Sequence, residues 1–387
     1  MRVRRCAVLM IEPRERLEFD LAQVNQGGDG LRAVIECVAH APHLLGEVPL
    51  SEAEASVLSR SSPTVWTSID MFAGDDQALV AALRAKGLLV GETGAEADAD
   101  RKIRDTCWRT TSAVLHFSSR WNGVDTRAPG NPFADSDEQN MLDRLGPAPP
   151  AVHEHVAASA RIALPVAPPT ELDRLLGRRV TCRNYDRRPL SLDAFSAVLY
   201  RAFGARAIDD YAPGLQVLKK GAPSAGGLHP TEAYVLAQNV DGVDCGLYHY
   251  HPVAHALEPL KPLDRAAAAV LVERFVASQE HFLGAHAVVI PAARFRRQSW
   301  KYRNHAKAYR ALVLDVGHLS QTLYLAATEL GLGAFITAAI NEVDIETAFG
   351  LDPLEEGPLA VCGFGIRAAE RTEVEFDPLN AVWPKDG

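Results

Sequence analysis

The sequence has no apolar run long enough to cross a membrane. Its first apolar stretch, within the opening residues MRVRRCAVLMIEPRE, ends at Glu12 and Pro13 with no small-residue cleavage site after it. A membrane-spanning helix needs about 20 consecutive apolar residues, and a secretory signal needs such a cleavage site. The opening stretch therefore predicts a strand over residues 6–12, and we expect a soluble, cytoplasmic protein.

Cysteine is scarce, and metal-binding spacing is absent. The six cysteines among the 387 residues include no C-x-x-C pair, and a chain of this length can build a core without disulfides. We expect reduced thiols and no zinc. The stretch YHYHP places His249 and His251 on one side of a strand, but no acidic or cysteine ligand follows at short spacing. A hairpin surface is therefore favoured over a metal site.

Positive charge is also in short supply. The chain has 40 Lys and Arg against 49 Asp and Glu, a formal net charge of −9, and its basic stretches are short. Proteins that bind nucleic acid concentrate cations on one face, so we expect no nucleic-acid partner. The apolar fraction of 47% and the charged fraction of 23% are typical of a globular enzyme.

Length and patterning predict two domains joined by a connection. Residues 1–95 contain the capping-box pair Ser51 and Glu54 at a helix start, and later a helix, Gly87 and a short strand. That order is typical of a winged-helix unit, and its low positive charge favours a peptide or protein partner over DNA. Residues 96–169 lose periodicity and are rich in proline, which predicts a connecting segment.

Residues 170–387 alternate between helical and strand patterns. Helices are predicted over 171–179, 191–204 and 305–330, a strand over 232–238, a hairpin over 245–260 and a last strand over 358–366. Strands broken by helices, with a hairpin among them, predict an α+β domain.

An alternating basic motif opens this second domain. Arg179, Thr181 and Arg183 stand at every second position, so an extended backbone would place all three on one side. Two guanidinium groups and a hydroxyl suit an anionic cofactor, because arginine offers two parallel donors to a phosphate. A solvated basic linker with Asp186 as partner also explains the motif, and is favoured when the motif is taken alone.

The loop GAPSAGGLHPTEAYV, residues 221–235, is nearly free of large side chains. It has no Gly-Lys-Ser/Thr for a P-loop, and Ala222 stands where a serine nucleophile elbow needs glycine before Ser224. Such a bare backbone is either a tight turn or a wall against a ligand, and this stretch by itself leaves both interpretations open.

Lys301 and Tyr302 precede the long apolar helix. A lysine beside a tyrosine usually lies on the surface, although each can act as an acid or base near a reacting centre.

In order and spacing, these pieces resemble the nitroreductase superfamily, and within it the SagB-type dehydrogenases that act with cyclodehydratases on ribosomally made peptides. RVTCRNY is similar to an Arg-x-Ser-x-Arg-x-Phe/Tyr signature, with Thr181 in the serine position, PSAGGLHP to a Pro-Ser-x-Gly loop, and GLYHYHP to a Gly-Leu-Tyr-x-Tyr hairpin. KYRNHAKAYR and DVGHLSQ are similar to the Lys-Tyr, Tyr-Arg and Gly-His-x-x-Gln run. The resemblance extends over residues 172–367.

The resemblance implies a nitroreductase-like fold, with a central mixed sheet flanked by helices, and an FMN-binding homodimer with the flavin in a cleft between subunits. Lys301 and Tyr302 match the pair that takes the proton lost during azoline oxidation. The cofactor residues that it implies are Arg179, Thr181, Arg183, Pro223, Ser224, Ala225, Gly226, Ala338 and Ala339, with Arg367 or Arg371 closing on the phosphate.

The preferred hypothesis is an FMN-dependent dehydrogenase that oxidises thiazoline or oxazoline rings in a precursor peptide, with a cyclodehydratase as possible partner and residues 1–95 gripping a leader peptide as an added strand. The first alternative is a flavin reductase that uses NAD(P)H to reduce dehydroamino acids in peptides, nitro compounds or quinones. An alternative of another class is a catalytically silent peptide-binding scaffold.

Overall fold

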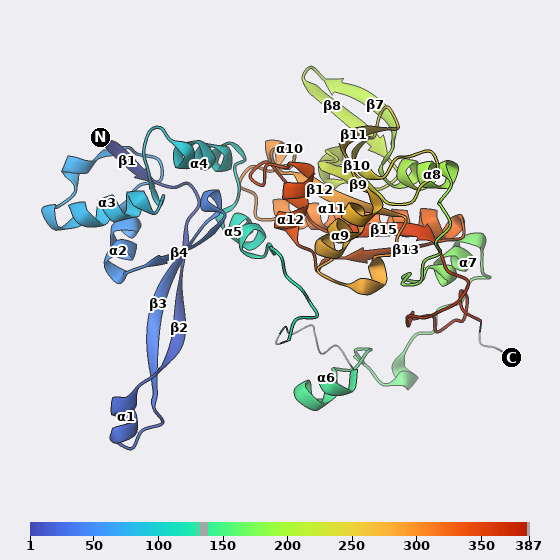
Figure 1. Cartoon of the computed structure of the whole chain (residues 1–387), viewed down its shortest axis with the longest axis horizontal. Helices are drawn as coiled ribbons and strands as arrows, with labels where there is room; N and C mark the ends of the chain where they lie inside the picture. The colour runs from blue at the N-terminus through green and yellow to red at the C-terminus, as the bar shows by residue number, and fades with distance from the viewer. Residues whose placement is uncertain (130, 132–137, 385–387) are drawn as a thin grey trace.

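The computed structural model of the chain describes residues 1–129, 131 and 138–384. Of the predicted connection, residues 130 and 132–137 lie outside the described residues, as do residues 385–387 at the carboxyl end. Figure 1 shows an amino-terminal unit on one side and a larger body, built around a central sheet, on the other.

The amino-terminal unit contains two small sheets around a helical pair. The sheets have the strand orders β5-β1-β6 and β2-β3-β4. The strands are β1 (Arg2–Arg5), β2 (Met10–Phe19), β3 (Leu31–Ala41), β4 (Gly46–Leu50), β5 (Thr67–Ser68) and β6 (Leu89–Val90), and the helices are α1 (Leu21–Asn25), α2 (Glu52–Arg60) and α3 (Gln77–Ala85).

The structure confirms two local features that the sequence predicted in this unit. Ser51 and Glu54 form the predicted capping box at the start of α2, and Gly87, with φ of +72°, follows α3 before β6 begins. The bounds of the predicted first strand, residues 6–12, are wrong. The first strand, β1, ends at Arg5 and places Val3 in the core, and the next strand begins only at Met10.

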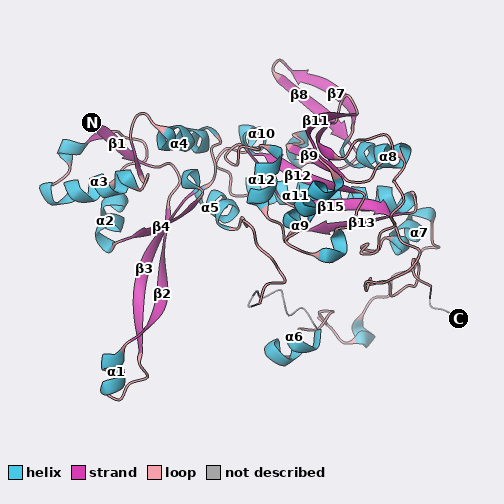
Figure 2. Ribbon diagram, in the orientation of Figure 1, coloured by secondary structure: helices cyan, strands magenta, loops and turns pink. Residues whose placement is uncertain are grey.

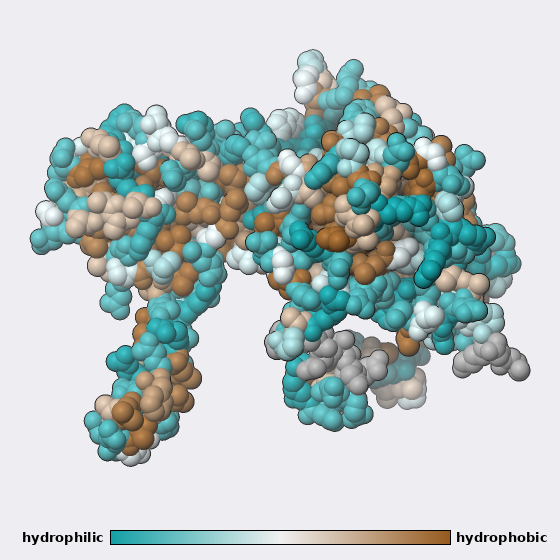
Figure 3. All heavy atoms as spheres, viewed as in Figure 1, coloured by the Kyte–Doolittle hydropathy of each residue, from teal (hydrophilic) through white to brown (hydrophobic). Residues whose placement is uncertain are grey.

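The β2–β3 hairpin projects away from the rest of this unit, with α1 near its tip (Figures 1 and 2). Apolar residues gather along this arm in Figure 3, and Phe19 is 74% exposed and Ile35 60% exposed. The arm therefore carries apolar surface away from the core.

Residues 95–118 are more ordered than a proline-rich connection suggests. They form α4 (Ala95–Asp105) and α5 (Thr110–Ser118), and α6 (Glu138–Leu145) follows later. Ile103 and Val114 share a core with Val8 of the amino-terminal unit and Leu354 of the larger body. The domain boundary near residue 95 stays a prediction, and this shared core shows that α4 and α5 join the two parts.

The larger body is an α+β structure around a seven-stranded sheet of order β11-β10-β9-β12-β15-β13, with β14 paired to β12. Parallel pairing occurs among the described residues only at isolated bridges such as Thr181 with Ala334. The strands are β9 (Thr231–Ala237), β10 (Gly246–His251), β11 (Ala256–Pro262), β12 (Ala287–Arg294), β13 (Leu332–Thr337), β14 (Glu356–Pro358) and β15 (Val361–Ile366).

Helices cover both faces of this sheet, so its central strand is apolar on both sides. In β12, Val289 packs in the core beneath α8 and α11, whereas Val288 and Ile290 pack in the core beneath α9 and α12. The helices of the body are α7 (Glu171–Arg178), α8 (Leu192–Phe203), α9 (Arg265–Phe275), α10 (Phe295–Lys301), α11 (Ala308–Glu329) and α12 (Glu342–Phe349).

A second hairpin, β7 (Ala205–Ala212) with β8 (Leu215–Lys220), forms a separate two-stranded sheet. It stands above the main sheet in Figure 1 and leads directly into the loop of residues 221–230. None of the described helices combines the length and the apolar character required to cross a bilayer.

Candidate functional site

The segment 179–184 alternates between a buried and a more exposed side. Val180, Cys182 and Asn184 are buried at 6%, 0% and 3% exposure. The opposite side carries the predicted cofactor residues Arg179, Thr181 and Arg183. The alternation expected from the sequence is therefore present in the structure.

Arg179 and Thr181 meet at Tyr324 of α11. The Thr181 and Tyr324 hydroxyl oxygens lie 2.9 Å apart, and the Arg179 guanidinium lies 5.4 Å from the centre of the Tyr324 ring. No carboxylate of the described residues lies within ion-pair distance of Arg179. Its charge is thus available to an anionic ligand.

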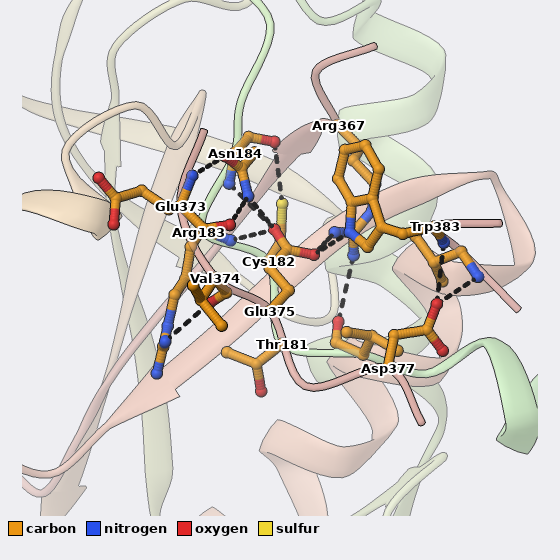
Figure 4. Close-up of polar contacts among 12 residues, drawn as sticks. Thr181, Cys182, Arg183, Asn184, Arg367, Glu373, Val374, Glu375, Asp377 and Trp383 are labelled. Carbon is orange, nitrogen blue, oxygen red and sulfur yellow. Dashed lines mark hydrogen bonds and ion pairs between the residues drawn. The ribbon is translucent and has the colours of Figure 1, made fainter. Parts of the chain in front are cut away.

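The carboxyl-terminal segment holds the other side of this motif (Figure 4). Glu375 accepts hydrogen bonds from the backbone N–H groups of Arg183 and Asn184, at 2.6 and 3.1 Å. The Asn184 side chain in turn accepts from the N–H groups of Thr372 and Glu373. Burial would raise the pKa of Glu375, but these and other hydrogen bonds outweigh it and hold that pKa below its usual value.

The two candidate arginines after the last strand have different surroundings. Arg367 forms an ion pair with Glu375, whose side chain is 0% exposed, and also donates to the Val180 carbonyl at 3.2 Å. Arg371 is exposed. Because its charge is already paired with Glu375, Arg367 acts here as a brace for the 179–184 segment, and a phosphate contact by either arginine stays a prediction.

Ser224 is engaged in building its own loop. Its hydroxyl donates to Asp315 of α11 at 2.6 Å and accepts from the His229 N–H at 3.0 Å, while the Ala225 N–H donates to Asp315 at 3.2 Å. Asp315 is 4% exposed, and this burial raises its pKa despite those two donors. The Ser224 hydroxyl therefore shapes the loop rather than standing free for a ligand.

Gly226 brings that loop against the Lys-Tyr pair. A Cβ on Gly226 would lie 2.7 Å from both Lys301 Nζ and Tyr302 Oη, and its φ of +63° favours glycine independently. Lys301 ends α10 and is exposed, whereas Tyr302 is half-buried. The structure thus places the predicted proton-transfer pair beside exposed backbone at Gly226, with Pro223 also exposed.

The predicted backbone donors Ala338 and Ala339 follow the end of β13. The Ala339 N–H donates to Thr337 Oγ1 at 3.2 Å, and the Ala339 carbonyl accepts from the Gln279 side chain at 2.9 Å. Ala338 is exposed. These local bonds fix the turn and leave Ala338 as the residue that faces outward.

The two groups of candidate residues lie at different places along α11. Asp315, which holds the glycine loop, and Tyr324, which meets Arg179, are nine positions apart, or about 14 Å of helix. One chain therefore presents a cationic group and a separate group around Lys301. A ligand that needs both groups must be extended, or must be completed by another chain.

Several residues of these groups were not predicted. Tyr324 has no distinctive signal within the apolar helix. Asp315 could have been found, because a carboxylate beside the apolar stripe of a core helix needs partners. Asn184 and Glu375 are 191 positions apart, so no local pattern connects them.

The segment between α4 and α5 reaches the turn that carries Tyr302. The Asn304 N–H donates to the Cys107 carbonyl at 2.7 Å, and Trp108 packs 4.8 Å from the Phe295 ring of α10. His116 of α5 is 2% exposed, and its Nδ1 lies 3.1 Å from the Tyr309 hydroxyl. Helix α5 is therefore part of the support beneath the Lys-Tyr pair.

The histidines of the hairpin β10–β11 have separate partners. His249 lies 2.7 Å from Glu258 and 3.3 Å from Glu232, whereas His251 accepts from the Ala254 N–H at 3.0 Å. No group of three or more potential metal ligands occurs in the described part of the chain.

Comparison with known proteins relates residues 176–366 to the nitroreductase family model. The protein named "Putative nitroreductase MJ1384" of Methanocaldococcus jannaschii is 31% identical over 209 residues, which are 53% of this chain and 95% of that protein. The trifolitoxin-processing protein TfxB of Rhizobium leguminosarum bv. trifolii is 31% identical over 173 residues, 44% of this chain and 46% of that protein. The microcin B17-processing protein McbC of Escherichia coli is 26% identical over 189 residues, 46% of this chain and 64% of that protein.

Proposed function

Because the chain belongs to the nitroreductase family, we propose that it is an FMN-dependent dehydrogenase. Its proposed substrate is a thiazoline or oxazoline ring in a ribosomally made peptide, which it oxidises to the aromatic azole. The observation that carries this proposal is the convergence of Lys301 and Tyr302 on bare backbone at Gly226. The similarity to the trifolitoxin-processing protein TfxB and the microcin B17-processing protein McbC supports the peptide substrate.

Flavin is the expected cofactor of this family, and the available donors fit a flavin mononucleotide. Arg179 offers a guanidinium with no ion-pair partner among the described residues, and Thr181 adds a hydroxyl beside it. Such a pair suits a phosphate, whereas exposed backbone at Gly226 and Ala338 suits a flat ring. Bound FMN would supply a two-electron acceptor for the hydride removed from the substrate ring.

In this proposal Lys301 and Tyr302 handle the proton. Conversion of an azoline to an azole removes two hydrogens, one as a hydride and one as a proton, so a base must stand beside the ring. Lys301 Nζ and Tyr302 Oη both lie next to the position that a Cβ of Gly226 would occupy. One of these two groups takes the proton while the other orients the ring.

We further propose that the protein acts as a homodimer with each active site shared between two chains. Tyr324, which meets Arg179, and Asp315, which holds the glycine loop beside Lys301, are about 14 Å apart along α11. A second copy that brings its own Lys301 group to the Arg179 group would complete the site.

The amino-terminal unit is proposed to bind a leader peptide. Its sheet of order β2-β3-β4 has two edge strands, and an extended peptide can add to such an edge through main-chain hydrogen bonds. A cyclodehydratase that forms the azoline is the proposed enzymatic partner.

The experiment that tests this function is turnover of an azoline peptide in air by purified protein loaded with FMN, with oxygen as the acceptor that reoxidises the flavin. Mass spectrometry should show loss of two hydrogens from the ring. Lys301→Ala and Tyr302→Phe should retain flavin and slow turnover by about 10² to 10⁴, while Arg303→Ala, an exposed neighbour, should remain near wild type. Retained flavin with full turnover in both variants would show that the assigned roles are wrong.

A further inference from the structure

An apolar pocket lies beside Lys301, and the hairpin residues and Trp300 that line it belong neither to the family motifs nor to the proton-transfer pair. Its volume is about 500 Å³, within the range of sites that bind small organic groups. The hairpin β7–β8 forms one wall with Tyr211, Leu215, Val217 and Leu218, and α10 forms another with Trp300 and Lys301. Gly226, Gly227 and Leu228 of the glycine loop complete the lining.

One arginine joins the hairpin wall to the glycine loop. Arg297 of α10 donates to the Gln216 carbonyl of β8 at 2.8 Å and to the Leu228 carbonyl of the loop at 3.1 Å. A two-stranded hairpin alone is only marginally stable. Arg297, one helical turn before Lys301, thus fixes the hairpin and the loop relative to the reacting pair.

The residues that line the pocket indicate which chemical groups can bind in it. Trp300 is 50% exposed and Tyr211 is 74% exposed, which leaves large aromatic surface uncovered. Lys301 is the one charged residue in the lining, and its cation disfavours lysine or arginine in the pocket. A neutral, apolar or aromatic group fits these walls.

We propose that this pocket binds a bulky apolar or aromatic side chain of the substrate peptide, at a residue next to the ring that is oxidised. This inference rests on the proposed function, since it names the peptide feature that the Lys301 site selects. Burial of that side chain would hold the neighbouring ring beside Lys301 and Tyr302. We therefore expect the protein to prefer azoline rings whose neighbouring residue is Phe, Leu or Trp.

The test is a binding series with the full-length protein carrying its cofactor. The probes are short, fluorescently labelled peptides without a leader, each with one oxazole flanked by Phe, Ala or Lys. Anisotropy should give a Kd roughly tenfold lower for the Phe peptide than for the Ala peptide, with the Lys peptide weakest. Equal affinity for all three peptides would overturn the inference.

Variants of the pocket residues test whether the pocket causes the preference for the Phe peptide. Leu215→Ala on the hairpin and Trp300→Ala on the helix should each bring the Phe and Ala peptides to within about threefold, leaving the Ala peptide unchanged. Ile208→Ala is the matched control, because Ile208 is on the same hairpin, is 46% exposed and does not line the pocket. A full Phe preference in both pocket variants would overturn the inference.

Other occupants give different results. Loss of bound flavin absorbance in Leu215→Ala and Trp300→Ala would assign the pocket to the cofactor, and a change from dimer to monomer would assign it to a second copy. Either result overturns the inference. Failure of the proposed function is distinguishable, since wild-type protein would then oxidise no azoline peptide while the Phe preference and its loss in the variants remain.

Discussion

Gly226 lies so close to Tyr302 that a single added methyl group would collide with the tyrosine hydroxyl, at 2.7 Å. The same methyl group would meet Lys301 Nζ at 2.7 Å. The bare loop is therefore shaped around the two side chains proposed to handle the proton.

Gly226→Ala should reduce azoline oxidation at least tenfold, because the new Cβ displaces Lys301 and Tyr302. Gly227→Ala is the matched control, since Gly227 also has positive φ, +69°, but has open space at its Cβ position. Both variants carry similar backbone strain of about 1 kcal/mol. Steady-state turnover measures the difference, and equal activity in the two variants would contradict the contact.

Asp315→Ala should destabilise the loop, because it leaves the Ser224 hydroxyl and the Ala225 N–H without their acceptor. The expected loss in free energy of unfolding is about 1 to 3 kcal/mol. A double-mutant cycle with Ser224→Ala, followed by urea denaturation, should give a coupling of at least about 0.5 kcal/mol. Strict additivity would show that the two residues do not interact in solution.

Arg367→Met should lower the free energy of unfolding by about 1.5 to 3 kcal/mol, because it removes the cationic partner of the buried Glu375 carboxylate, which keeps its hydrogen bonds from Arg183 and Asn184. Arg371→Met is the control, since that exposed residue should change stability by less than about 0.5 kcal/mol. Urea denaturation gives both values, and equal effects would show that the Arg367–Glu375 ion pair does not stabilise the 179–184 segment. Flavin release from each variant also tests which arginine, if either, binds the phosphate.

His116 should make stability fall in mild acid. Burial lowers its pKa to about 3, from an ordinary 6.5. The unfolded chain therefore takes up a proton below pH 6.5 that the folded protein refuses until about pH 3, so its contribution to stability is lost as the pH falls through this window.

Between pH 7.5 and pH 5, His116 should lower the free energy of unfolding of the wild-type protein by about 2 kcal/mol. The His116→Phe variant should lose about 2 kcal/mol less than wild type over the same interval. Urea denaturation at the two pH values measures the difference. His153→Gln is the control, because His153 is exposed and should leave the wild-type pH dependence intact. An unchanged pH dependence in His116→Phe would show that His116 is not held neutral in the folded state.

Local signals predicted much of the fold. The capping box at Ser51 and the helix start at Ser191 depend on residues within one turn, and apolar periodicity defined α11. The β7–β8 hairpin was missed because nearly all of β7 is exposed, so it has no alternation of apolar and polar residues. Asn184 and Glu375 could not be paired from the sequence, since their contact depends on how the carboxyl-terminal segment folds back.

For the candidate site, the sequence predicted the alternation of one segment but not the tertiary partners of its residues. The alternation of Arg179, Thr181 and Arg183 follows from extended backbone, and it is present. The internal ion pair of Arg367 and the use of Ser224 by Asp315 are tertiary contacts, which only the assembled fold reveals.

We propose that bound FMN accepts electrons directly from an azoline peptide, and anaerobic single turnover tests this claim most directly. Purified protein, with its chromophore identified as FMN by mass, is mixed with an azoline peptide in the absence of NAD(P)H and oxygen. We predict that the visible flavin absorbance bleaches in step with loss of two hydrogens from the peptide. An intact flavin spectrum with the peptide, but rapid bleaching by NAD(P)H, would contradict the claim and favour a flavin reductase.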